Sequence, residues 1–137
     1  MKSWYALAVM AFAVPVAALA FEDETPTVKT VMNKLHKGST SQSKNLEKQA
    51  QASPPDWEAI SKTTKDFVIL GAAMAKNDPT KGDKEQWKKL ANKYFDNAKG
   101  LDDAAKDKDI TKLQAARKSM GASCKECHSA HREEEKH

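Results

Sequence analysis

Cysteine is scarce in this chain, which has only two among its 137 residues, at Cys124 and Cys127. A disulfide between cysteines this close in sequence closes a very small loop and adds little stability. There is no second cysteine pair to complete a structural zinc site. The βαβ pattern that accompanies a thioredoxin-like redox pair is also missing. The sequence therefore disfavours the three commonest functions of a close cysteine pair.

Other absences limit the fold and the partners. No segment shows the apolar and polar alternation of a half-buried strand, and no Asn-Gly hairpin signal occurs. After residue 20, no run is apolar enough to span a membrane. The formal net charge is only +4 and the lysines are scattered, so the sequence gives no case for nucleic-acid binding. These absences favour a helical domain that binds neither nucleic acid nor, once processed, a membrane.

The first twenty residues have the pattern of a secretory signal. Lys2 precedes an apolar run from Trp4 to Ala20, and the acidic stretch Glu22-Asp23-Glu24 follows. A membrane anchor is the alternative, but the run is near or below the required length and Pro15 interrupts it. We predict a signal peptide at 1–20 cleaved after about Ala20, a periplasmic location, and a single domain at 21–137.

Four apolar stripes at helical spacing follow the signal. Thr25-Pro26 predicts the start of the first helix. The segment Gly38 to Ser41 either ends that helix or interrupts a longer one that resumes through Ala52, and the sequence leaves both options open. Ser53-Pro54-Pro55-Asp56 predicts the start of the second helix.

Two aspartates predict where the remaining helices begin. Asp83 is expected to cap the third helix and Asp109 the fourth, because a carboxylate at this position accepts a backbone N–H of the first turn. Four amphipathic helices joined by short loops predict an all-α fold. We expect an antiparallel up-down-up-down four-helix bundle, with both cysteines on the last helix.

The segment Cys124-Lys125-Glu126-Cys127-His128 has the spacing of a covalent haem-attachment site. Two thiols can add to the two vinyl groups of a haem, and positions three and four apart on a helix share one side. We therefore predict one covalently attached haem c, with Cys124 and Cys127 forming the thioethers and His128 as the proximal iron ligand.

The sixth iron position has several candidates. Met120 and His131 lie one turn from the motif on the same helix, which places them on the proximal side. Met32 lies on the apolar face of the first helix and is the candidate ligand from across the bundle, with ordinary core packing as the alternative. Three roles are open for His36: it binds the iron, it hydrogen-bonds a propionate, or it lies in solvent. We expect it to lie in solvent. Arg132 either contacts a propionate or lies in solvent.

Taken together, these residues resemble the class II cytochromes c, the cytochrome c′ family. The similar residues are Met120 to His128, Arg132 and Trp87, and the resemblance extends from about Thr25 to Arg132. It implies a four-helix bundle with the haem motif near its C-terminal end. The stretch Val31-Met32-Asn33-Lys34-Leu35 is similar to the methionine-bearing segment of the family's low-spin branch, which implies Met32 as the distal ligand. Because paired bundles are common in this family, a homodimer is also an option.

The sequence then predicts a function. We expect a periplasmic monohaem c-type cytochrome that carries single electrons between redox partner proteins and is not an enzyme, because no nucleophile, base and orienting group share a recognisable spacing. The first alternative is a five-coordinate cytochrome c′-like protein that binds NO or CO. The second is a haem-free helical metal-binding or scaffold protein that uses His128, His131 and His137.

Overall fold

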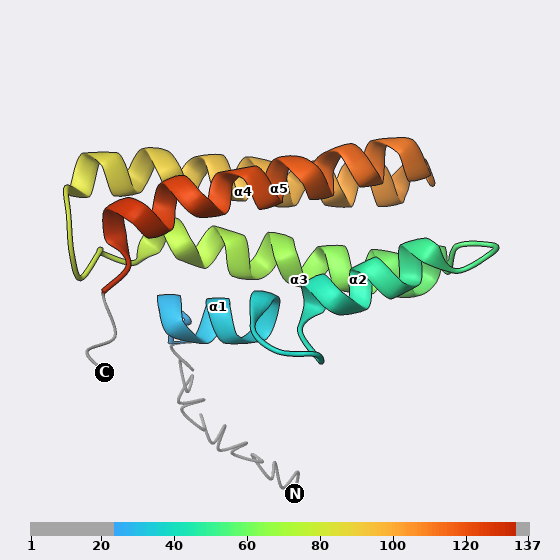
Figure 1. Cartoon of the computed structure of the whole chain (residues 1–137), viewed down its shortest axis with the longest axis horizontal. Helices are drawn as coiled ribbons and strands as arrows, with labels where there is room; N and C mark the ends of the chain where they lie inside the picture. The colour runs from blue at the N-terminus through green and yellow to red at the C-terminus, as the bar shows by residue number, and fades with distance from the viewer. Residues whose placement is uncertain (1–23, 134–137) are drawn as a thin grey trace, which may run out of the picture.

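Residues 24–133 are described by this computed structural model, and within them every regular element is a helix (Figure 1). The helices are α1 (Val28–His36), α2 (Gln42–Gln51), α3 (Trp57–Lys76), α4 (Lys84–Lys106) and α5 (Ile110–His131). None of them is both long and apolar enough to cross a membrane. The all-α prediction is confirmed for this part of the chain, whereas the predicted signal peptide lies outside it.

The helices alternate in direction as an antiparallel bundle does. Helices α1 and α2 run the same way and together form the first arm, and α3, α4 and α5 then reverse direction in turn (Figure 1). The up-down-up-down order with the cysteine motif on the last helix is as predicted. The bundle has five helices rather than four because its first arm is broken.

The break in the first arm lies at Gly38. Its φ of +86° is in the left-handed region, where a residue with a side chain is strained, so a continuous helix cannot pass through this position. The N–H of Lys37 caps α1 by donating to the carbonyl of Met32, over 3.1 Å. Ser41 then begins α2 from a buried position. The break therefore makes α1 a short helix of nine residues.

Aspartate side chains start the three long helices. Asp56, Asp83 and Asp109 each accept a hydrogen bond from the backbone N–H three residues later, over 3.0, 2.7 and 3.0 Å. Each bond satisfies one of the N–H groups that a helix start leaves without an intrahelical partner. The predicted caps Asp83 and Asp109 are confirmed.

The predicted start of the first helix at Thr25 is wrong by two residues. Thr27 is the N-cap, and its Oγ1 accepts a hydrogen bond from the N–H of Thr30 over 3.2 Å. The carbonyl of Pro26 accepts a bond from the side-chain amide of Asn77 over 2.9 Å, which ties this residue to the end of α3. Pro26 therefore lies outside the helix rather than in its first turn.

The helices pack in a row rather than in a closed ring. Helices α1 and α2 pack against each other and against α3, α3 packs extensively against α4, and α5 packs mainly against α4. The side chains that are almost completely buried in the core are Phe67, Leu35, Leu46, Ile60, Leu101, Leu113, Val31 and Thr64. The side between α5 and the first arm is therefore the least filled part of the bundle.

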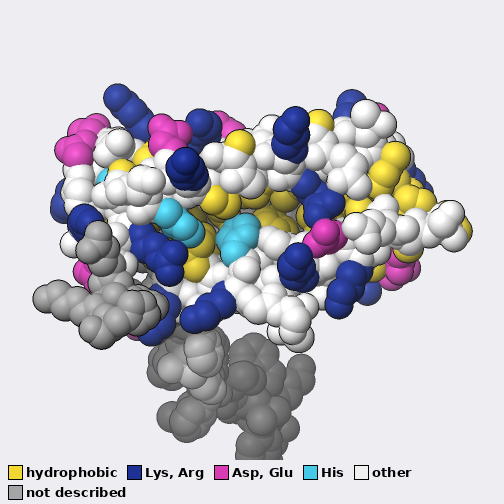
Figure 2. Space-filling view, viewed as in Figure 1, with side chains coloured by type: hydrophobic (Ala, Val, Ile, Leu, Met, Phe, Trp, Pro, Cys, Tyr) yellow, Lys and Arg dark blue, Asp and Glu magenta, His cyan; other side chains and the backbone are white. Residues whose placement is uncertain are grey.

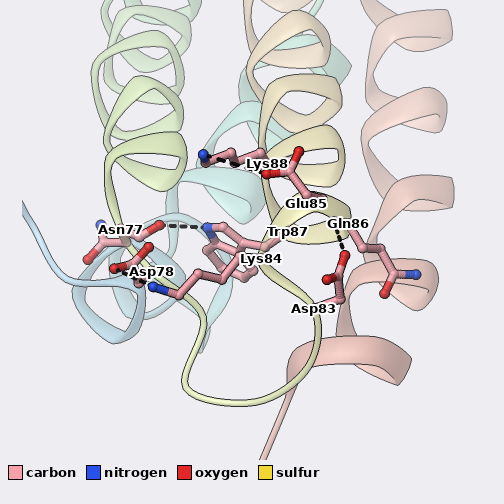
Figure 3. Close-up of polar contacts among 8 residues, drawn as sticks. All are labelled: Asn77, Asp78, Asp83, Lys84, Glu85, Gln86, Trp87 and Lys88. Carbon is pink, nitrogen blue, oxygen red and sulfur yellow. Dashed lines mark hydrogen bonds and ion pairs between the residues drawn. The ribbon is translucent and has the colours of Figure 1, made fainter.

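The connection between α3 and α4 holds the C-terminal end of α5. The indole N–H of Trp87 donates to the carbonyl of Asn77 over 2.7 Å and fixes the start of the loop (Figure 3). Farther along, the Lys81 carbonyl lies 2.8 Å from Nδ1 of His131. Gly82 has a φ of +88°, and a Cβ built on it would lie 2.7 Å from the carbonyl oxygen of Ala130. Only glycine fits between this loop and the last turn of α5.

Candidate functional site

The cysteine motif lies in the last two turns of α5, and its thiols face the interior. Cys124 and Cys127 are half-buried and are not bonded to each other. Cys127 packs against the hydrophobic core, and Cys124 lines a cavity. Helical spacing accounts for this arrangement, because residues three apart lie on the same side of a helix. The two thiols are therefore presented together to the least filled side of the bundle.

The cavity has a volume of about 200 Å³ and is walled by all five helices. Its lining residues are His36, Ser43, Leu46, Phe67, Leu101, Arg117, Met120, Gly121 and Cys124. A space-filling view shows a hollow on this face, in which hydrophobic side chains are visible between α5 and the first arm and histidine side chains lie at the margin (Figure 2). The site is thus a mainly apolar slot with a few polar groups, as ligand sites usually are.

Burial keeps the groups around the thiols in their neutral forms. It raises the pKa of Cys124 and of Cys127 above the ordinary thiol value, and the neighbouring Cys124 and Glu126 raise that of Cys127 further. Burial also raises the pKa of the Tyr94 hydroxyl well above its usual range, and both cysteines add to this effect. Tyr94 on α4 therefore belongs to the surroundings of the motif.

His128, the predicted proximal ligand, lies on α5 directly after Cys127 and is exposed. Burial lowers the pKa of His36 on α1, and the charge of His128 lowers it further. The assignment of His128 as proximal ligand remains a prediction. An exposed imidazole beside the two thiols is free to turn toward a metal, which suits that role.

Met32, the predicted distal ligand, lies on α1 and is partly buried against the hydrophobic core. It is not among the residues that line the cavity. Core packing, the alternative for this residue, therefore describes its present contacts, and ligation by Met32 remains a prediction.

His36, one turn after Met32, does line the cavity. Its Nε2 is hydrogen-bonded to the Tyr94 hydroxyl over 2.7 Å, and its Nδ1 to the Ser43 hydroxyl over 2.8 Å. Its ring also contacts the rings of Phe67 and Tyr94 edge-on, with centroids 5.8 and 5.9 Å apart. The expectation that His36 meets solvent is wrong, because partners on α2, α3 and α4 surround the ring.

Two arginines are candidate contacts for the acidic propionates of a haem. The sequence pointed to Arg132 but not to Arg117. Arg132 is exposed just beyond α5, and its N–H caps that helix by donating to the His128 carbonyl over 3.1 Å. Its predicted contact with a propionate remains a prediction. Arg117 lines the cavity and was missed. Its position two turns before Cys124 on the same helix face is the signal that would have found it.

The arrangement does not favour the haem-free metal-binding alternative. His131 is buried, packs edge-on against Trp87 with ring centroids 5.3 Å apart, and is bonded to the Lys81 carbonyl. Between residues 24 and 133, no three His, Cys, Asp or Glu side chains are grouped so as to hold a metal ion. The third predicted ligand of this alternative, His137, lies outside the described residues. In this part of the chain, His131 has a packing role.

The residues present do fit a haem. The Cys124 thiol lines an apolar slot together with the His36 imidazole and the cationic Arg117. Cys127 lies one turn farther along α5 against the core, and His128 is exposed beside it. Gly121 adds to the fit, because a Cβ built on it would have no neighbouring atom within 4 Å. The face of α5 one turn before Cys124 is therefore open to a flat ring. A haem bound here would supply a one-electron redox centre or an iron site for a diatomic gas.

Comparison with known families gives one match. Residues 81–132 match the family described as Cytochrome C′, a range that covers α4, α5 and the whole cysteine motif. No match was found among curated proteins or among solved structures. The family match supports a c-type cytochrome of the cytochrome c′ kind, whereas the roles of Cys124 and Cys127 remain predictions.

Proposed function

We propose that this chain is a periplasmic one-electron carrier with a single covalent haem c, in which protein side chains occupy both axial positions of the iron. His128 on α5 supplies the proximal position. The partner helix for the other position is α1, which carries both Met32 and His36. The resemblance to the low-spin branch points to Met32. In this proposal the chain is a carrier and not an enzyme.

The observation that supports the proposal is the position of α1. Helix α1 lies across the cavity from the cysteine-bearing face of α5, and His36 from this helix lines the same cavity as Cys124. A side chain that reaches the iron from this wall leaves no room for an external gas. A closed iron with two protein ligands exchanges electrons with little change in its coordination, which suits transfer through an exposed haem edge.

Partners in this proposal are other redox proteins that bind transiently. The face with the hollow carries many lysine and arginine side chains and few acidic ones (Figure 2). Such a surface attracts a partner with negative charge around its own redox centre and speeds their encounter at low salt. The rate of electron exchange is therefore expected to fall as ionic strength rises.

The test is a set of visible spectra of the holoprotein, produced in a host that attaches haem c. We expect low-spin spectra in both oxidation states, no change when CO or NO is added, and a redox titration that follows a single one-electron curve. High-spin spectra together with rapid CO binding would contradict the proposal. That result would instead support the five-coordinate, gas-binding alternative.

A further inference from the structure

We infer that His36, rather than Met32, is the second axial ligand of the iron. The hydrogen bond between Ser43 and Nδ1 and the ring contacts with Phe67 and Tyr94 position its ring. This inference rests on the proposed function, because it names the ligand that closes the iron. It gives the protein two imidazole ligands, one from α5 and one from α1.

Position on the wall of the cavity is the first support. His36 and Cys124 line the same cavity from opposite sides, whereas Met32 packs against the core and is absent from the lining. Both residues lie on α1, separated by one turn. Among the residues of α1, His36 is the one that lines this cavity.

The hydrogen bonds of the ring are the second support. A histidine that binds a metal usually donates its other ring N–H to a neighbouring acceptor, which fixes the tautomer and the ring orientation. Ser43 provides such a partner for Nδ1 over 2.8 Å. With the proton on Nδ1, the lone pair of Nε2 is available, and here it accepts the hydrogen bond of the Tyr94 hydroxyl over 2.7 Å. Iron and Tyr94 therefore compete for the same lone pair.

The surroundings of the ring are the third support. Edge-on contacts with Phe67 and Tyr94 confine the ring, so it loses little conformational freedom on binding a metal. The ring also lies in the wall of the cavity that Cys124 lines, so it does not have to move far to reach a group bound there. His131, which is buried, has no such relation to the cavity, because Trp87 and Lys81 hold it at the end of the bundle.

Three alanine variants of the holoprotein test the inference. His36→Ala should change the ferric spectrum from low-spin to high-spin, and CO should bind to the ferrous form. Added imidazole should restore the low-spin spectrum of this variant, because it replaces the missing ring. Met32→Ala should stay low-spin. Asn33→Ala, at an exposed position of α1, is the matched control for substitution on this helix.

The wild-type spectrum is a second readout that needs no variant. Two imidazole ligands give a low-spin ferric spectrum without the methionine-to-iron charge-transfer band. They also give a lower reduction potential than a histidine and methionine pair, because methionine ligation raises the potential. This readout remains decisive if His36→Ala does not fold.

The outcomes separate the inference from the proposed function. A low-spin wild type that shows the charge-transfer band, and loses it only in Met32→Ala, would overturn the role of His36 and leave the electron carrier standing. A high-spin wild type that binds CO would overturn both. A low-spin wild type without the band supports both, provided that only His36→Ala becomes high-spin and that added imidazole restores its low-spin spectrum.

Discussion

The hydroxyl of Tyr94 lies 2.7 Å from Nε2 of His36 and joins α4 to the last residue of α1 across 58 positions of the chain. The same tyrosine lies close enough to Cys124 and Cys127 for both thiols to raise its pKa. Tyr94 therefore links the end of α1 to the central helices near the cysteine motif.

Tyr94→Phe removes this hydroxyl and keeps the ring that packs against His36. We expect the free energy of unfolding of the haem-free protein to fall by about 1 kcal/mol, the usual net contribution of one hydrogen bond. Because the competitor for Nε2 is lost, the holoprotein should remain low-spin and bind CO no better than wild type. Urea unfolding and CO titration measure the two effects. A variant that becomes high-spin would show that the hydroxyl supports the ligand instead of competing with the iron.

Ser43→Ala removes the partner of Nδ1 of His36. Loss of the hydrogen-bonding partner of the ring nitrogen that does not bind the metal typically weakens metal binding about 10- to 100-fold. The reason is that the ring is no longer held in one tautomer and orientation. We expect a mixture of low-spin and high-spin iron and measurable CO binding. Ser39→Ala, an exposed serine in the loop between α1 and α2, is the matched control and should behave as wild type. Equal CO binding by both variants would argue against a role for Ser43.

Substitution of the two cysteines tests the covalent attachment. Cys124→Ala and Cys127→Ala should each retain a haem held by one thioether, and the double variant should lose covalent haem altogether. Mass spectrometry of denatured protein measures the added mass of the haem. The central assignment fails if wild-type protein from a host with haem-maturation machinery carries no such mass, or if the double variant still does.

Gly82→Ala tests how the loop before α4 fixes the end of α5. The new Cβ would lie 2.7 Å from the Ala130 carbonyl oxygen, and the φ of +88° is unfavourable for alanine. We expect a loss of about 2 kcal/mol or more, together with a change in the haem spectrum, because the last turn of α5 shifts. Urea unfolding of the holoprotein measures the loss.

Gly100→Ala is the matched control for that variant. Gly100 lies inside α4, and a Cβ there would meet Ala116 at an ordinary 3.9 Å. This substitution should stabilise the protein by about 1 kcal/mol, the difference in helix propensity between the two residues. If Gly82→Ala were equally stabilising, the contact between the loop and α5 would not be tight.

Features set by neighbours in sequence were predictable. Asp83 and Asp109 start their helices as expected, because a cap depends on the next three residues only. The position of Cys124, Cys127 and His128 on the last helix was predictable for the same reason, because the cap at Asp109 and the helical spacing are local. The family match over residues 81–132 covers this same part of the chain.

Features set by distant contacts were not predictable. The sequence left the chain at Gly38 undecided, because a single glycine is tolerated inside a helix and equally adopts the positive φ that ends one. His36 was expected in solvent, since nothing near it in sequence revealed Tyr94 as its partner. Pro26 was expected inside a helix. The hydrogen bond that ties it to Asn77 instead joins residues 51 positions apart, so nothing near Pro26 in the sequence revealed it.

The order of helix packing has a consequence for cooperativity. The helices form an open row in which α1 and α2 are followed by α3, α4 and α5. The two ends of this row, the α1 and α2 pair and α5, have few neighbours. A group bound by α5 and by α1 joins the two ends of the row into a closed circuit. The binding energy then couples the first and last helices, so their unfolding becomes one transition instead of two local ones. Hydrogen exchange of α1 and α5 should therefore slow together when the haem is attached.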